Sequence, residues 1–173
     1  MQLVLVFGVV SLLAAVGVAV ATGGRDIREK LTGYEEIPTL STPANGEFKV
    51  RISRFSEKIE YKLSYRGFET PVLQAHIHLG ARAFNGGISV FLCSNLPNPP
   101  AGTPACPTPA GTVEGTLEPA DVIGPAGQGI AAGEFDELVD AIRAGVTYAN
   151  VHSEARPGGE IRAQLEDDDN GRW

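Results

Sequence analysis

Short runs in which apolar and polar residues alternate recur along this chain, and no other feature of the sequence constrains the fold as strongly. In residues 48–53 and 59–65 every second side chain is apolar or aromatic, and charged or hydroxyl side chains occupy the positions between them. Successive side chains of a β-strand point to opposite faces, so each run predicts a strand with one buried face. The link over residues 54–58 is short enough for a hairpin.

Further strands are predicted downstream, and together they indicate the fold class. Residues 73–79 alternate in the same way, a Gly86-Gly87 turn leads into a strand over 88–93, and residues 111–117 can form one more. The 21 Gly and 12 Pro residues favour many turns over long helices. Short strands at regular spacing predict an all-β fold, either a two-sheet antiparallel sandwich or a flattened barrel.

One short helix is predicted before the C-terminal hairpin. Residues 119–133 are rich in Gly, Ala and Pro and are expected to be loop. After them, apolar residues follow the helical spacing i, i+3, i+4 and i+7, namely Phe135, Leu138, Val139 and Ile142. Gly145 is expected to end this helix.

The C-terminal unit, residues 148–165, predicts two strands joined by a turn at Pro157-Gly158-Gly159. A register that pairs Glu154 with Glu160 gives this hairpin one apolar and one polar face, as a stable register requires. The same register sets His152 beside Arg162 on the polar face.

The N-terminal segment predicts export from the cytoplasm. Residues 3–21 are almost wholly apolar and end in Ala19-Val20-Ala21, a small-x-small cleavage pattern, so we interpret residues 1–21 as a signal peptide. The run is also long enough to span a bilayer, which leaves an uncleaved N-terminal anchor as the alternative. Both alternatives place the domain outside the cytoplasm, and the membrane is expected to be a partner only through this segment.

Composition divides the rest of the chain into three parts. We expect a polar linker over residues 22–30, one domain over residues 31–166, and a disordered acidic tail over residues 167–173. The net charge of −7 provides no basic surface that could follow a phosphate backbone, so nucleic acid is not an expected partner.

Cys93 and Cys106 are the two cysteines of the chain. A cysteine pair in an exported protein predicts a disulfide, and the loop between these two holds four prolines, which exclude a helix or a central strand. A crosslink there would stabilise the fold by roughly 3 kcal/mol. Two unrelated buried thiols are the alternative.

The three histidines are the candidate functional residues. His76 and His78 are two residues apart on a predicted strand and therefore share a face, and His152 lies on the polar face of a second predicted strand. Three neutral imidazoles suit Cu or Zn and leave a coordination position open for water or substrate. The expected hydrogen-bond partners around the ligands are Gln74, Asn150, Glu154, Glu160 and Arg162. The alternative is a hydrogen-bonded histidine cluster that stabilises the sheet surface and titrates near pH 6–7.

Three motifs in order resemble the CHRD (chordin) domain. They are Leu-Thr-Gly-Tyr-Glu-Glu-Ile-Pro at 31–38, Ala-His-Ile-His-Leu-Gly at 75–80, and Tyr-Ala-Asn-Val-His-Ser at 148–153 followed by Pro-Gly-Gly-Glu-Ile-Arg-Ala-Gln-Leu at 157–165. The resemblance covers roughly residues 30–166 and implies an all-β, extracellular domain. The family occurs as repeats in chordin, an antagonist of bone morphogenetic proteins, and as stand-alone exported microbial proteins. The single copy here, without cysteine-rich modules, is similar to the stand-alone type.

A weaker likeness concerns the histidines. The H-x-H pair on a strand and a later Val-His near a Gly-rich turn are similar to the copper-ligand pattern of Cu,Zn superoxide dismutase. That enzyme is also a β-sandwich, so the resemblance implies an immunoglobulin- or superoxide dismutase-like sandwich with one metal ion. It further implies redox chemistry such as superoxide dismutation if the ion is Cu, with Arg156 or Arg162 guiding an anion; a Zn ion would be structural or would activate water.

Two functions therefore remain open at the level of the sequence. The first is an exported CHRD domain that binds one Cu or Zn ion through His76, His78 and His152, with or without redox activity. The second is a non-catalytic extracellular module whose loops, including the Pro-rich segment 94–110, contact a protein or cell-wall partner, and whose histidines form a structural cluster.

Overall fold

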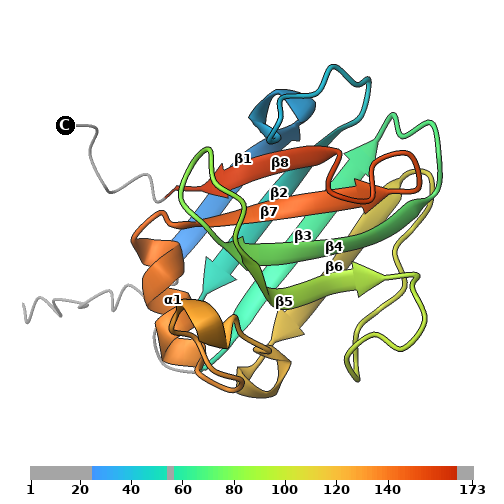
Figure 1. Cartoon of the computed structure of the whole chain (residues 1–173). Coiled ribbons are helices and arrows are strands. Elements are labelled where there is room, and N and C mark those ends of the chain that lie inside the picture. The colour runs from blue at the N-terminus through green and yellow to red at the C-terminus, as the bar shows by residue number, and fades with distance from the viewer. Residues whose placement is uncertain (1–24, 54–56, 167–173) are drawn as a thin grey trace, which may run out of the picture.

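The structure is a computed structural model that describes residues 25–53 and 57–166 of the 173-residue chain (Figure 1). The predicted signal peptide or anchor, the acidic tail and residues 54–56 of the predicted hairpin link lie outside the described residues. Within the described ranges, no helix is long and apolar enough to cross a membrane.

Eight strands and one α-helix form the framework of the described chain. In chain order they are β1 (Arg25–Thr32), β2 (Asn45–Ile52), β3 (Ile59–Arg66), β4 (Val72–Leu79), β5 (Gly87–Ser94), β6 (Gly111–Leu117), α1 (Phe135–Arg143), β7 (Thr147–Ser153) and β8 (Ile161–Leu165). Short 3-10 helices lie at Gly33–Glu35, Pro119–Asp121 and Ala126–Gln128. The all-β prediction, with one short helix before the C-terminal hairpin, is confirmed.

The strands form one antiparallel sheet in the order β5-β4-β7-β8-β1-β2-β3-β6. Its two halves face each other as layers, with α1 at one end (Figure 1). The halves are connected where Thr32 of β1 pairs with Arg162 of β8. The two separate sheets of the predicted sandwich are therefore not observed, because this pairing makes the sheet continuous and the fold a nearly closed barrel.

The apolar core lies between the two halves of the sheet. The alternation in β2 and β3 buries every second residue from Phe48 to Ile52 and from Ile59 to Tyr65, as predicted. Ile77 of β4 and Val151 of β7 belong to the same core cluster and are fully buried. This packing fixes which face of β4 and β7 points inward and leaves their histidines on the opposite face.

The barrel remains open between its edge strands, β5 and β6. The Tyr61 hydroxyl donates to the Leu92 carbonyl across this seam at 2.6 Å, and the Ser94 amide donates to the Pro104 carbonyl at 2.9 Å. The predicted disulfide between Cys93 and Cys106 is present, with 5.0 Å between the Cα atoms. The crosslink fastens the Pro-rich loop to the end of β5.

The helix α1 follows the sequence prediction closely. The four apolar residues at helical spacing are buried, with exposures of 0 to 5 %, and they are Phe135, Leu138, Val139 and Ile142. Gly145 follows the helix with φ +70°, a left-handed conformation that glycine adopts without steric cost.

The predicted linker over residues 22–30 is wrong for its second part, because residues 25–30 belong to β1. Ile27 and Leu31 are buried on one face, but Glu29 occupies the position between them on that face. A charged residue at a core-facing position removes the alternation from which the strand could have been predicted.

The C-terminal hairpin has the predicted faces but a different register. Asn150 pairs with Arg162, and Ala149 pairs with Ala163, so Arg162 does not lie beside His152 as predicted. The register differs by two residues, which keeps every side chain on its predicted face. The pattern of apolar residues therefore could not distinguish the two registers; the loop closed by the Glu160 amide and the Val151 carbonyl, 2.8 Å apart, selects the observed one.

Candidate metal centre

The outer face of β4, β7 and β8 carries a buried layer of polar side chains. Its members have exposures between 0 and 7 %, and they are Glu36, His76, His78, Tyr148, Asn150, His152, Arg162 and Gln164. We call this set the buried polar layer. Loops cover it: the Phe84 and Gly80 carbonyls accept hydrogen bonds from Arg162 and Gln164, and the Pro157 carbonyl lies 3.0 Å from His152 Nδ1. The histidines are thus interior groups, whereas the sequence pattern placed them on a sheet surface.

The strand register brings the three imidazoles together. His76 and His78 point to the same face of β4, and their ring centroids are 5.3 Å apart. On the neighbouring strand β7, His152 pairs with Gln74, two residues before His76. The His152 ring consequently lies diagonally across the strand pair, 4.9 Å from the His76 ring and 6.0 Å from the His78 ring.

Main-chain carbonyls fix the proton positions on two of the rings. His78 Nδ1 is 3.1 Å from the Gly86 carbonyl, and His152 Nδ1 is 3.0 Å from the Pro157 carbonyl. A carbonyl oxygen accepts only, so each Nδ1 carries the proton and each Nε2 presents a lone pair.

His76 is held by the other imidazoles and not by the main chain. Its Nδ1 lies 3.2 Å from His152 Nε2, which has a lone pair, so His76 Nδ1 donates to it. The Nε2 atoms of His76 and His78 are buried and have no hydrogen-bond partner within the described part of the chain. Two imidazole nitrogens with free lone pairs are thus kept away from water.

Burial keeps the histidines neutral. Desolvation, with smaller contributions from the neighbouring imidazoles, lowers the pKa of His76 to about 2. Desolvation also lowers the pKa of His78, to about 4, against an opposing hydrogen bond to Gly86. The pKa of His152 is lowered by burial as well. For His76 and His78 these values disagree with the titration near pH 6–7 that was expected of a histidine cluster on the sheet surface.

The arrangement fits a single metal ion. One nitrogen from each of the three histidines lies within 4.8 Å of the others. The 3.2 Å between His76 Nδ1 and His152 Nε2 is close to the roughly 3.3 Å that separates two nitrogens bound to one tetrahedral ion at about 2.0–2.1 Å. Neutral, desolvated imidazoles are donors that suit Zn and Cu.

Aromatic rings pack against the histidines on two sides. The Tyr148 ring stacks on His78 at 4.7 Å with an interplanar angle of 2°, and its hydroxyl accepts from the Gly86 amide. Phe91 of β5 meets His76 edge-on, with 4.3 Å between ring centroids. These contacts restrict the orientations of the imidazoles.

The five residues predicted to surround the ligands do not hydrogen bond to the imidazoles in the described structure. Asn150 donates to Glu36 and to the Ile161 carbonyl, Glu160 accepts from Thr42 and Ser153, and Arg162 lies over the Tyr148 ring. Gln74 faces His152 across the strand pair, and Glu154 is exposed. Their contribution around a bound ion stays a prediction.

The sequence analysis missed the groups that fix the imidazole rings. For two of these groups the sequence contains little information that could have identified them. The accepting carbonyls of Gly86 and Pro157 belong to the main chain, and any residue type carries one. Tyr148 could have been found, because it is two and four residues from Asn150 and His152 and must share their face.

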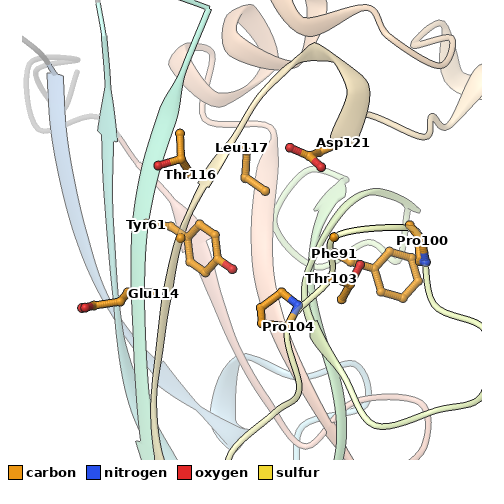
Figure 2. A pocket seen from close by; sticks show the side chains of 11 residues that line it. Tyr61, Phe91, Pro100, Thr103, Pro104, Glu114, Thr116, Leu117 and Asp121 are labelled. Atoms are coloured by element: carbon orange, nitrogen blue, oxygen red, sulfur yellow. The ribbon is translucent and has the colours of Figure 1, made fainter.

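A cavity of about 230 Å³ lies in the seam between β5 and β6 (Figure 2). Tyr61 and Phe91 line it together with Pro100, Pro104 and Asp121. No histidine lines this cavity, but Phe91 contacts both the cavity and His76.

Comparisons with known proteins agree with the motif pattern. The family model that describes the CHRD domain matches residues 27–165, most of the described chain. No curated protein and no solved structure gives a significant match. The likeness to Cu,Zn superoxide dismutase therefore rests on short motifs alone, whereas the chain belongs to the CHRD domain family.

Proposed function

We propose that this protein is an extracytoplasmic CHRD-domain protein that binds one Cu or Zn ion through His76, His78 and His152. The observation that carries the proposal is the convergence of three neutral imidazoles on a buried point. Family membership and the disulfide are both consistent with an extracellular location.

The chain's own residues would prepare the ligands for the ion. The Gly86 and Pro157 carbonyls hold the protons of His78 and His152 on Nδ1, so that both Nε2 lone pairs are available. His76 would use its nitrogen nearest His152, and its proton would move to the other ring nitrogen. A bound Cu ion would supply one-electron chemistry, and a Zn ion would supply structural support or water activation.

Metal content is the direct test of this proposal. Untagged protein loaded with Cu or Zn and then desalted should retain about one ion per chain. His152→Ala should lose the ion, because two ligands remain, while Glu114→Ala, an exposed change on β6 in the other half of the sheet, should keep it. Circular dichroism must show that both variants are folded. Equal metal content in the two variants, or no retained metal in the unchanged protein, would contradict the proposal.

Superoxide dismutation is the redox activity that we propose for the Cu-loaded form. Arg162 is 1 % exposed and cannot meet an anion at the surface, whereas Arg156 is exposed in the loop that covers His152. Arg156→Glu should therefore lower a measured dismutation rate, and the loss should shrink at high ionic strength because screening weakens long-range attraction. Cu-loaded protein with no rate above that of His152→Ala would refute the activity without affecting the metal site.

A non-catalytic interaction module is the second candidate function. Tyr34 and Phe84 are 73 % and 70 % exposed, which is unusual for large aromatic side chains in a folded domain. Aromatic residues contribute strongly to protein–protein interfaces. Under this alternative, a Tyr34→Ala and Phe84→Ala double variant would lose an extracellular protein partner, while His152→Ala would retain it.

A further inference from the structure

Arg162 is a buried cation within the buried polar layer. It is 1 % exposed, and its guanidinium carbon lies 3.3 Å from the centroid of the Tyr148 ring. Its N–H groups donate to the Phe84 carbonyl at 2.8 Å, to the Ala81 carbonyl at 3.4 Å and to Asn85 Oδ1 at 3.2 Å. All three acceptors are neutral, so none of them cancels the positive charge.

Carboxyl groups compensate the positive charge of Arg162 only in part. Among the residues that the structure describes, no carboxylate forms an ion pair with Arg162. Glu36 and Glu35 act on Arg162 without forming an ion pair with it, and burial raises the pKa of Glu36 to about 7, which weakens its contribution at neutral pH.

Tyr148 connects this cation to the histidines. The Tyr148 ring lies between the guanidinium, 3.3 Å from its centroid on one face, and the His78 ring, 4.7 Å away and parallel to it. The charge of Arg162 is therefore within about 8 Å of the His78 ring. At this distance the guanidinium repels a second positive charge held by the histidines.

We propose, on the basis of the metal site described above, that Arg162 makes this site selective for monovalent Cu(I) over the divalent ions Cu(II) and Zn(II). Three neutral ligands leave the full charge of the ion uncompensated in a buried site. The cost of desolvating an ion grows with the square of its charge, and repulsion by Arg162 grows in proportion to it. Both effects penalise a divalent ion more than a monovalent one.

The size of the Arg162 contribution follows from its distance. One additional unit of charge on the ion, about 8 to 10 Å from the guanidinium in surroundings with an effective dielectric constant of about 20, changes the relative affinity roughly 15- to 30-fold. This factor is the expected bias toward Cu(I) that the guanidinium alone provides.

The experiment measures the affinity of the folded protein for Cu(I), by anaerobic competition with bathocuproine disulfonate, and for Zn(II), by competition with a chromogenic chelator. Arg162→Gln should raise the Zn(II) affinity relative to the Cu(I) affinity roughly 15- to 30-fold. The Cu(II)/Cu(I) midpoint potential should fall in Arg162→Gln, because a positive charge favours the reduced ion.

A second variant avoids replacing a buried residue. Asn85 is exposed and already accepts from Arg162, so Asn85→Asp retains its shape and supplies a partner charge to Arg162. It should shift the affinity ratio and the potential in the same direction as Arg162→Gln, but by a smaller factor because solvent screens an exposed carboxylate. Asn98→Asp, the same exposed change in the Pro-rich loop, is the matched control and should shift neither.

The outcomes separate this inference from the proposed function. If Cu(I) and Zn(II) bind in a His152-dependent manner but the ratio is unchanged in Arg162→Gln and Asn85→Asp, the role of Arg162 is refuted and the metal site stands. Tighter binding of Zn(II) than of Cu(I) by the unchanged protein would also overturn the selectivity. If neither ion binds through His152, both proposals fail.

Discussion

Acidification should destabilise the metal-free protein through its buried histidines. The folded-state pKa values of His76 and His78 are about 2 and about 4, below the ordinary value of 6.5. In the unfolded chain these two imidazoles therefore bind protons at a pH at which they stay neutral in the folded chain. The free energy of unfolding falls as the pH drops below about 6.5. Between pH 7 and pH 5 each of these two histidines costs about 2 kcal/mol, and His152 acts in the same direction.

Glu36 opposes this effect, and its contribution has to be separated. Burial raises its folded-state pKa from 4.5 to about 7, so the folded chain takes up a proton at Glu36 that the unfolded chain does not bind until lower pH. Acidification from pH 7 to pH 5 thus gains about 2 kcal/mol of stability at this residue. For the three groups with a numerical pKa, the net loss is about 2 kcal/mol, which His152 increases.

Urea unfolding of the metal-free protein at pH 7 and pH 5 measures the loss of stability, and two variants separate its causes. Glu36→Gln keeps an acceptor for Asn150 but removes the opposing titration, so the loss should increase to about 4 kcal/mol or more. His78→Gln should reduce the loss by about 2 kcal/mol. A pH dependence that is the same in all three proteins would show that these buried groups do not titrate as the structure requires.

Several smaller perturbations test other parts of the structure. Replacing Cys93 and Cys106 together by serine should lower the free energy of unfolding by about 3 kcal/mol, measured in urea, because the crosslink closes a loop of 13 residues. Phe48→Ala should cost about 3–5 kcal/mol, seen as a lower Tm, because Phe48 is fully buried in the core. Gly86→Ala should lower metal affinity in a chelator competition, because a Cβ at Gly86 would lie 1.6 Å from the Leu79 carbonyl and displace the group that orients His78. A Cu or Zn ion present at 100 times its Kd should raise stability by about 2.7 kcal/mol at pH 7, an effect that His152→Ala should abolish.

Successive side chains of a strand point to opposite faces, and this explains why the sequence could predict the faces of the strands but not the continuity of the sheet. The alternation in residues 48–53 and 59–65 reflects burial on one side, and it correctly gave the core positions of β2 and β3. The strand order depends on which strand edges pair. Neither Thr32 nor Arg162 carries a sequence feature that indicates their pairing. For the same reason a hairpin register shifted by two residues satisfied the pattern equally well, although the observed pairs differ.

The candidate ligands were predictable, whereas their surroundings were not. Two histidines separated by one residue must share a face of β4, and the polar pattern of β7 placed His152 on the face that adjoins them. Whether that face is solvated depends on the loops around Gly86 and Pro157, whose positions follow from the tertiary fold. Those loops bury the imidazoles, and burial is what makes the site neutral at acidic pH.

The unpartnered nitrogen of His78 favours the proposed metal site over a purely structural histidine cluster. In a cluster that only stabilises the sheet, buried polar atoms are expected to be paired, because each unpaired one costs about 1–3 kcal/mol. Here the Nε2 atom of His78 is buried without a partner in the described chain, and the Tyr148 ring stacks on the same imidazole. The fold bears this free-energy cost. The Gly86 carbonyl holds the proton of His78 on Nδ1, so the lone pair of His78 Nε2 stays available. Coordination of an ion supplies the interaction that such a lone pair lacks, and it accounts for the convergence of three rings better than sheet stability does.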